Sequence, residues 1–167
     1  DEFLAFDAVL IFNDYSYCDP YNLGDTLADY IDAGGRVVTA FGEGSWDRIR
    51  GRWEDDEYFV FDSSSWIDQA CCSGTDISIG QIYEPNHPIL EGVNSFSTVY
   101  YTYFDPPLAE NATTIADYAE VYGPGNDLIA VKSVNGVNTA ALGFFPISNN
   151  ALWGSWDLYT DGALIMA

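Results

Sequence analysis

The side chains best suited to acid–base chemistry lie in or beside predicted loops. These candidates are Asp14, Glu43, His87 and Asp157. Two carboxyl groups that flank a glycosidic bond can act as acid and base, and tryptophan faces can stack on sugar rings. The tryptophans that could do so are Trp46, Trp153 and Trp156. Carbohydrate binding or processing is therefore one hypothesis, although with 26 Asp and Glu residues some carboxylates will lie near any pocket.

A cysteine nucleophile with a histidine base is a second, hydrolytic hypothesis. It requires Cys18 to lie within hydrogen-bond reach of His87, the chain's single histidine. His87 precedes Pro88, and an imidazole at the start of a short turn can instead cap backbone groups. We favour that structural role and expect no cysteine–histidine pair.

The cysteines predict a disulfide rather than a metal site. Three cysteines and one histidine supply too few ligands at the wrong spacings for zinc. Outside a cell, Cys18 is expected to pair with Cys71 or Cys72, which leaves one thiol over. Asn111-Ala112-Thr113 is an acceptor sequence for N-glycosylation if the protein is secreted by a eukaryote. We predict no metal and no cofactor.

Three of the four arginines gather at residues 48–52, directly before Trp53. In one interpretation Arg52 and Trp53 contact an anion or a carbohydrate. In the other, the arginines neutralise the carboxylates of residues 55–57. We favour the second interpretation because acidic residues outnumber basic ones by 26 to five.

Composition limits the classes of partner. The net charge of −21 leaves no basic patch beyond residues 48–52, so nucleic acid and anionic membranes are poor partners. The sequence contains no apolar run of about 18 residues, the length that would predict a membrane-spanning helix. The hydrophobic fraction of 48% excludes disorder, and 167 residues predict one domain. The aromatic fraction of 16% exceeds what a core of this size needs, which favours protein interfaces or glycan contacts.

A strand–helix–strand unit at residues 7–44 is the element that must position these groups. Residues 8–12 and 37–41 are apolar without alternation, as in strands covered on both faces. Asp19 and Pro20 predict the start of a helix, and Gly34-Gly35 predicts its end. A single helix between two short strands predicts a parallel crossover.

Three motifs carry a resemblance to a known family: LADYIDAGG at residues 27–35, HPILEGV at 87–93 and ALGFFP at 141–146. With them the chain resembles the class I glutamine amidotransferase-like fold, in particular the ThuA-like branch found in secreted and surface proteins. The resemblance implies an α/β fold, a flavodoxin-like three-layer sandwich with a mostly parallel central sheet. It also implies that residues 1–167 are one domain taken from a longer chain. Asn135-Gly136 independently predicts a late β-hairpin.

The family's catalytic positions are degenerate in this sequence. The turn that carries the family's cysteine nucleophile has Gly42 at the matching position. Phe145 stands where the family has its histidine base, and Ile147 stands where it has the acid that orients the base. Glycine cannot attack a carbonyl and a phenyl ring cannot accept a proton, so the resemblance implies a scaffold without its triad.

The leading hypothesis is therefore a non-catalytic structural or interaction module of an extracellular or cell-surface protein, possibly homopolymeric. Its partner would be protein, either a second copy or another domain of the parent chain, and glycans are an alternative. Residues 97–104 alternate like an exposed edge strand. We expect partners to bury that strand or the late tryptophan loop. The residues concerned are Tyr100, Tyr101, Tyr103, Trp153 and Trp156.

Overall fold

A computed structural model describes residues 2–13, 15–40, 48–62, 68–70, 77–99, 102–104, 106–119, 126–152 and 155–167, with the backbone alone at 68–70 and 102–104. Its elements, in chain order, are η1 (Glu2–Ala5), β1 (Ala8–Phe12), α1 (Pro20–Asp32), β2 (Arg36–Ala40), α2 (Arg52–Asp55), β3 (Asp68–Ala70), β4 (Ile77–Ile82), η2 (Pro88–Leu90), β5 (Ser97–Thr98), β6 (Thr102–Phe104), β7 (Thr113–Tyr118), β8 (Asp127–Val134), β9 (Val137–Leu142) and α3 (Gly162–Ile165).

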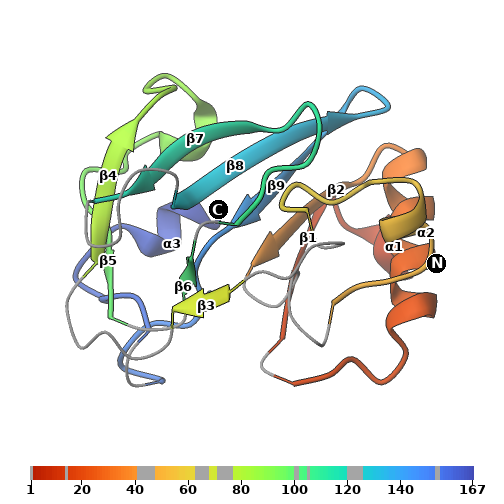
Figure 1. Cartoon of the computed structure of the whole chain (residues 1–167), viewed down its shortest axis with the longest axis horizontal. Helices are drawn as coiled ribbons and strands as arrows, with labels where there is room; N and C mark the ends of the chain where they lie inside the picture. Colours follow the sequence, from red (N-terminus) through yellow and green to blue (C-terminus); the bar gives the residue numbers. More distant parts are fainter. Residues whose placement is uncertain are drawn as a thin grey trace.

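A mixed, curled sheet forms the centre of the described part of the chain (Figure 1). Seven strands lie in the order β1-β2-β9-β8-β7-β4-β5. The β1–β2 and β2–β9 pairs are parallel, whereas the pairs from β9 through β5 are antiparallel. The flavodoxin-like sandwich with a mostly parallel sheet is therefore wrong, because the chain returns through hairpins after β2 instead of repeating helical crossovers.

The predicted strand–helix–strand unit is present, and local sequence signals explain it. The Asp19 carboxylate accepts a hydrogen bond from the Asn22 backbone N–H at 3.0 Å, and Pro20 opens α1. The helix ends where Gly34 takes a φ of 95°, a conformation that favours glycine. β1 and β2 then pair in parallel, from Ala8 opposite Arg36 to Phe12 opposite Ala40.

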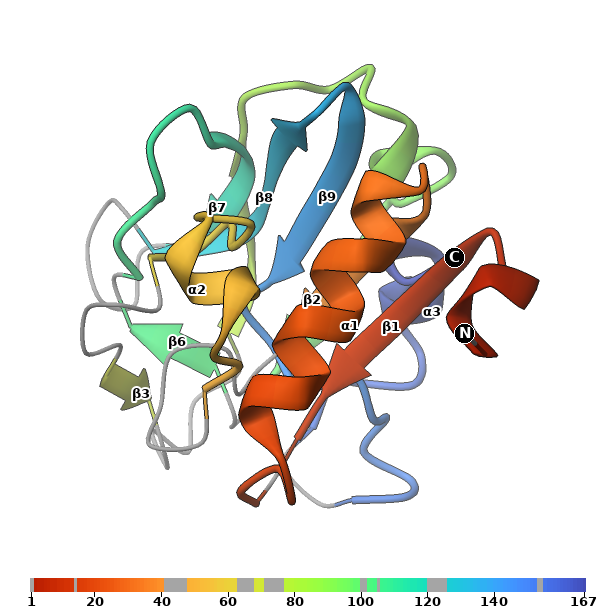
Figure 2. The same ribbon diagram turned by 90° about the vertical axis from the view of Figure 1, so that its right-hand side faces the viewer.

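β1 differs from its prediction because it is an edge strand. Its outer side has no partner strand among the described residues. On the face away from α1, the Phe12 ring meets the ring of the buried Phe145 edge-on, with ring centres 5.7 Å apart. Val9 and Ile11 lie half-buried beneath α1, whereas Ala8, Leu10 and Phe12 are exposed. Figure 2 shows β1 beside α1, and β1 is the first strand in the order of the sheet. An unbroken apolar run thus does not show that a strand is central.

The antiparallel half contains the predicted late hairpin. β8 and β9 are joined by Asn135 and Gly136, whose φ values of 51° and 81° are those a tight hairpin turn requires. The single strand predicted at residues 97–104 is instead two short strands. β5 pairs with β4, and β6 pairs with β3 in a separate two-stranded sheet.

Two large clusters of buried side chains hold the layers together. Leu27 and Ile31 of α1 pack with Val37, Trp53 and Tyr58 in the cluster beneath α1 and α2. The second cluster joins η2 and α3 to the central strands through Leu90 and Ile165. None of the described helices is long and apolar enough to cross a membrane.

Candidate functional site

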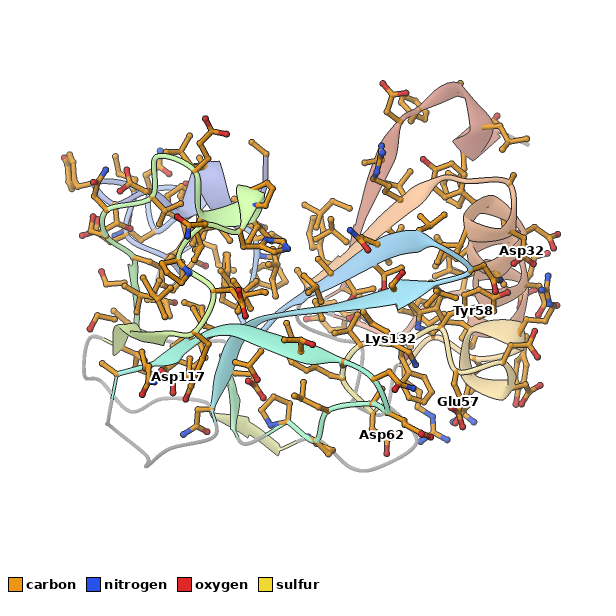
Figure 3. All side chains as sticks on the ribbon, turned by 90° about the horizontal axis from the view of Figure 1, so that it is seen from above. Asp32, Glu57, Tyr58, Asp62, Asp117 and Lys132 are labelled. Carbon is orange, nitrogen blue, oxygen red and sulfur yellow. The ribbon has the colours of Figure 1, made fainter. Side chains whose placement is uncertain are left out.

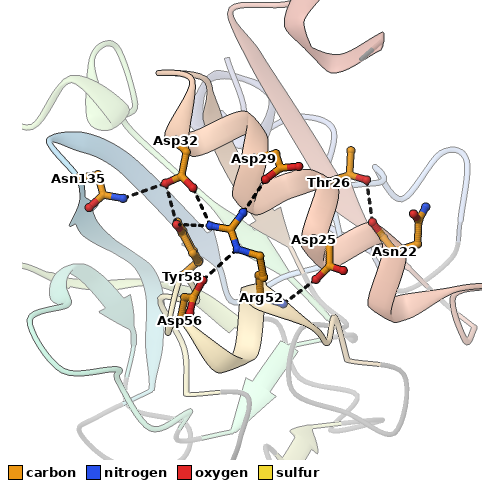
Figure 4. Close-up of polar contacts among 9 residues, drawn as sticks. All are labelled: Asn22, Asp25, Thr26, Asp29, Asp32, Arg52, Asp56, Tyr58 and Asn135. Atoms are coloured by element: carbon orange, nitrogen blue, oxygen red, sulfur yellow. Dashed lines mark hydrogen bonds and ion pairs between the residues drawn. The ribbon is translucent and has the colours of Figure 1, made fainter.

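Arg52 is the centre of a polar network on the outside of α1 and α2 (Figure 4). Its guanidinium binds the carboxylates of Asp29 and Asp32 on α1, at 2.5 and 2.7 Å, and that of Asp56 at 3.0 Å. Asp32 also accepts hydrogen bonds from the Tyr58 hydroxyl at 2.7 Å and from the Asn135 amide at 2.9 Å. The network therefore joins both helices to the β8–β9 turn.

These contacts change the acidity of the groups involved. Hydrogen bonds from Arg52, Tyr58 and Asn135 lower the pKa of Asp32. The pKa of Arg52 is raised, mainly by its hydrogen bonds to Asp32 and Asp56. Burial, followed by the bond to Asp32, raises the pKa of the Tyr58 hydroxyl. Because Arg52 already binds three carboxylates, it is a structural cation, and the anion contact considered from the sequence is not favoured by this arrangement.

The lowered pKa of Asp32 predicts a pH-dependent contribution to stability. The contribution is present above the unfolded pKa of 3.8 and is lost as pH falls through the lower folded value. Since the pair is partly exposed, we expect Asp32→Asn to lower the free energy of unfolding at pH 7 by about 0.5–1 kcal/mol. Thermal unfolding from pH 7 to pH 2 would measure this.

Asp7→Asn is the matched control, because it makes the same charge change at an exposed position. Subtracting the control removes the general effect of lowering the chain's negative charge. The difference between the two variants should shrink as the solution is acidified. A difference that stays constant down to pH 2 would contradict the role given to the Asp32 carboxylate.

Lys132, the single lysine, is buried beside a hollow of about 200 Å³ lined by Glu57, Phe59, Asp62, Leu108, Ala109 and Glu110 (Figure 3). Its ammonium donates a hydrogen bond to the Glu57 carbonyl oxygen at 2.7 Å and lies 5.6 Å from the Phe59 ring centre. Glu57 has a positive φ of 56°, so Lys132 helps to fix a turn that a side chain rarely adopts. The described residues include no group of His, Cys, Asp or Glu side chains placed to hold a metal ion.

Asp117 is a buried carboxylate with a structural task. The pairing of β4 with β7 shifts register between Ile79 and Ile82. Asp117 accepts a hydrogen bond from the Gln81 backbone N–H at 2.6 Å and another from the Tyr83 hydroxyl at 2.9 Å. This second bond raises the pKa of Tyr83. The Asp117 carboxylate thus supplies a hydrogen-bond acceptor for the Gln81 backbone N–H where the register between β4 and β7 shifts.

Two tryptophans proposed as surface residues are buried, which corrects the sequence interpretation. Trp53 is 1% exposed and stacks against Tyr58, with ring centres 6.1 Å apart. Trp156 is 8% exposed and packs in the cluster beneath η2 and α3. Both rings fill spaces between elements that are distant in sequence, so neither can stack on an external ligand as it lies.

The proposed thiol–imidazole pair is not favoured by the positions of its members. The His87 ring accepts a hydrogen bond from the Ile89 backbone N–H at 3.3 Å and caps η2, which is the structural role predicted for it. Cys18 is an exposed free thiol just before α1, beside the opposite end of the strand order. Asp157, a candidate acid, accepts hydrogen bonds from the Asn149 amide and the Tyr159 backbone N–H within its own loop.

The structure describes some of the remaining predicted site residues and not others. Phe145 is 3% exposed in a buried cluster against which the partly buried Ile147 packs, so the two side chains that the proposed resemblance matches to catalytic positions pack as apolar residues. Asn111 is exposed in a turn with a positive φ of 65°, and its glycosylation stays a prediction. The other proposed site residues lie outside the described residues, in full or in their side chains: Asp14, Gly42, Glu43, Trp46, Cys71, Cys72, Tyr100, Tyr101, Tyr103 and Trp153.

β1 and the segment before it carry several exposed apolar residues, which the sequence interpretation missed. We call them the apolar margin: Leu4, Phe6, Ala8, Leu10 and Phe12. Leu4 and Phe6 are 55% and 61% exposed, and Leu10 and Phe12 are 36% and 41% exposed. Within β1, alternation places Ala8, Leu10 and Phe12 on one face, but the sequence hides this because Val9 and Ile11 between them are also apolar. Leu4 belongs to η1, where a period of two does not apply.

Comparison with known proteins shows the fold alone. No family model and no curated protein matches the chain. A β-galactosidase from Rahnella sp. R3 is similar in structure to this chain, with a TM-score of 0.55 and 15% sequence identity. The similar region covers 83% of this chain and 20% of the β-galactosidase. A β-galactosidase from Bacillus circulans sp. alkalophilus matches 86% over 21%, with 14% identity and a TM-score of 0.59. The mmIFT52 N-terminal domain matches 99% over 75%, with 14% identity and a TM-score of 0.58.

The chain thus spans about a fifth of the length of these β-galactosidases. None of these structures is described as amidotransferase-like, so that resemblance stays a prediction.

Proposed function

We propose that this chain is a non-catalytic protein-binding module that docks another polypeptide on its apolar margin. The observation that carries the proposal is the outer edge of β1, whose backbone groups have no partner strand among the described residues. Leu10 is 36% exposed beside it, and Phe12 is 41% exposed although its ring also contacts that of Phe145. A sheet edge supplies directional hydrogen bonds, and its side chains supply apolar area. Together these are the elements of a protein interface.

The distribution of buried and exposed residues supports binding over chemistry. Arg52, Lys132 and Asp117 hold elements of the fold together, and the Phe145 and Ile147 side chains pack in the core. Carbohydrate binding is the weaker candidate, because Trp53 and Trp156 are buried. An extracellular or cell-surface location is part of the proposal. It rests on the lysine-poor acidic composition and the Asn111 acceptor sequence.

Selection of random peptides displayed on phage tests the module. We expect binders selected on the chain to lose at least about tenfold in affinity for Phe6→Ser/Leu10→Ser, since burial of two large side chains contributes several kcal/mol. Leu158→Ser/Leu164→Ser is the matched control, because those leucines are 39% and 45% exposed and lie elsewhere. Binders that tolerate the first variant as well as the second would overturn the proposed docking surface.

A further inference from the structure

We propose that Asn135, in the turn between β8 and β9, is a deamidation site whose reaction is held back by its hydrogen bond to Asp32 (Figure 4). Asn135 is the only asparagine of the chain that is followed by a glycine. The reaction is a chemical modification of the polar network around Arg52, and it is independent of docking on the apolar margin.

Deamidation at this turn needs only the chain and water. The Gly136 backbone nitrogen attacks the Asn135 side-chain carbon Cγ, and a C–N bond forms. The Cγ–Nδ2 bond breaks, and Nδ2 leaves as ammonia with the proton that the Gly136 nitrogen gives up. Water then opens the resulting succinimide. Addition of water at Cγ leaves aspartate at position 135, and addition at the main-chain carbonyl carbon leaves isoaspartate.

The attacking nitrogen and the water that opens the ring both have room at this turn. Asn135 and Gly136 are exposed, and a Cβ added at Gly136 would meet nothing within 4 Å. Glycine has no side chain that could shield its own nitrogen. The β8–β9 ladder ends at the pair Val134 and Val137, so both turn residues lie beyond it. Access therefore does not limit the reaction.

The hydrogen bond of the Asn135 side chain is what opposes the reaction. The amide donates to the Asp32 carboxylate at 2.9 Å. A carboxylate only accepts hydrogen bonds, so Nδ2, the atom that must leave, is the one that faces α1. Ring closure draws Cγ onto the backbone, and the departure of Nδ2 removes the donor. The bond to Asp32 is therefore lost along the reaction path, which raises the barrier.

Asp32 is a well-fixed acceptor for this bond. The Tyr58 hydroxyl donates at 2.7 Å to the same carboxylate oxygen that Asn135 binds, and Arg52 binds the other oxygen at 2.7 Å. Arg52 and Tyr58 come from α2 and the segment that follows it. The contact between the helices and the β8–β9 turn thus keeps Asn135 in its amide form.

Peptide mass spectrometry of the 167-residue chain, incubated in mildly alkaline buffer, measures the rate of deamidation at Asn135. We expect Asp32→Ala to raise this rate at least about threefold, because it removes a hydrogen bond to a charged acceptor. Asp29→Ala is the matched control, since it removes another carboxylate of α1 that binds Arg52 and leaves Asp32 in place. The control should change the rate less than about twofold.

Concentrated urea separates protection by the fold from the reactivity of the sequence. In urea the unchanged chain and both variants should react at one rate, since the Asp32 contact is lost. Equal rates for the two variants in buffer, or an unchanged chain that reacts as fast in buffer as in urea, would overturn the inference. An equal acceleration at Asn94, an exposed asparagine of another loop, would also overturn it, because it would report general unfolding.

The product of the reaction places a second carboxylate against Asp32. Asn135→Asp mimics this product, and Asn135→Gly removes the hydrogen bond without adding charge. Asn-Gly, Asp-Gly and Gly-Gly all suit a tight hairpin turn. We expect a lower midpoint of thermal unfolding for Asn135→Asp than for Asn135→Gly at neutral pH, with the gap closing as salt screens the two carboxylates. An Asn135→Asp chain at least as stable as Asn135→Gly would contradict this effect of the modification.

Discussion

Replacing Trp53 with alanine should lower the free energy of unfolding by about 3–5 kcal/mol, the range for removing a large buried aromatic side chain. Trp53 is 1% exposed and packs with Leu27, Ile31 and Ile49 between α1 and α2. The cavity left by its removal would lie where α1 and α2 meet. Urea-induced unfolding followed by circular dichroism would measure the loss.

The Trp53 variant also decides between the two interpretations of this residue. Tyr159→Ala is the control, because Tyr159 is 88% exposed and its truncation should cost less than about 0.5 kcal/mol. Trp53→Phe should recover part of the stability. A Trp53→Ala protein that is as stable as the Tyr159 control, yet loses affinity for a ligand, would restore the surface role inferred from the sequence.

Gly24→Ala should cost at least about 2–3 kcal/mol, although alanine is the better helix former by about 1 kcal/mol. A Cβ at Gly24 would lie only 1.7 Å from the Arg50 carbonyl oxygen and 3.0 Å from the Trp53 Cβ. These neighbours are backbone or the base of a buried side chain, so α1 would have to move away from the residues around α2. The midpoint of thermal unfolding should fall accordingly.

Gly34→Ala provides the comparison for Gly24→Ala. Its added Cβ would meet nothing within 4 Å, so its cost is limited to the positive φ of 95°. That strain is worth about 1–2 kcal/mol. If Gly24→Ala were stabilising, as helix propensity alone predicts, the close approach of α1 to the Arg50 backbone would be wrong.

The two glycines also bear on the proposed module. α1 supports one face of β1 through Val9 and Ile11, so displacement of the helix should loosen the strand that carries the apolar margin. We therefore expect Gly24→Ala to weaken peptide binding in proportion to its effect on β1, and Gly34→Ala to leave binding nearly unchanged.

Local signals in the sequence determined much of the first half of the fold. The Asp19 cap, the Pro20 start and the Gly34 stop of α1 depend on neighbours a few residues away, and all three are present. The Asn135-Gly136 turn and the His87 cap are equally local. Such features follow from backbone conformation and short-range hydrogen bonds, which a sequence pattern encodes directly.

Tertiary structure alone decided the strand order and whether the large aromatic side chains are buried or exposed. An apolar run such as residues 8–12 fits a central strand or an edge strand, because periodicity records which side chains are apolar and not which strand lies beside them. Trp53 and Trp156 likewise became core residues through contacts with elements far away in the sequence. The outer edge of β1 is likewise free of a partner among the described strands because of long-range strand pairing, which local sequence cannot specify.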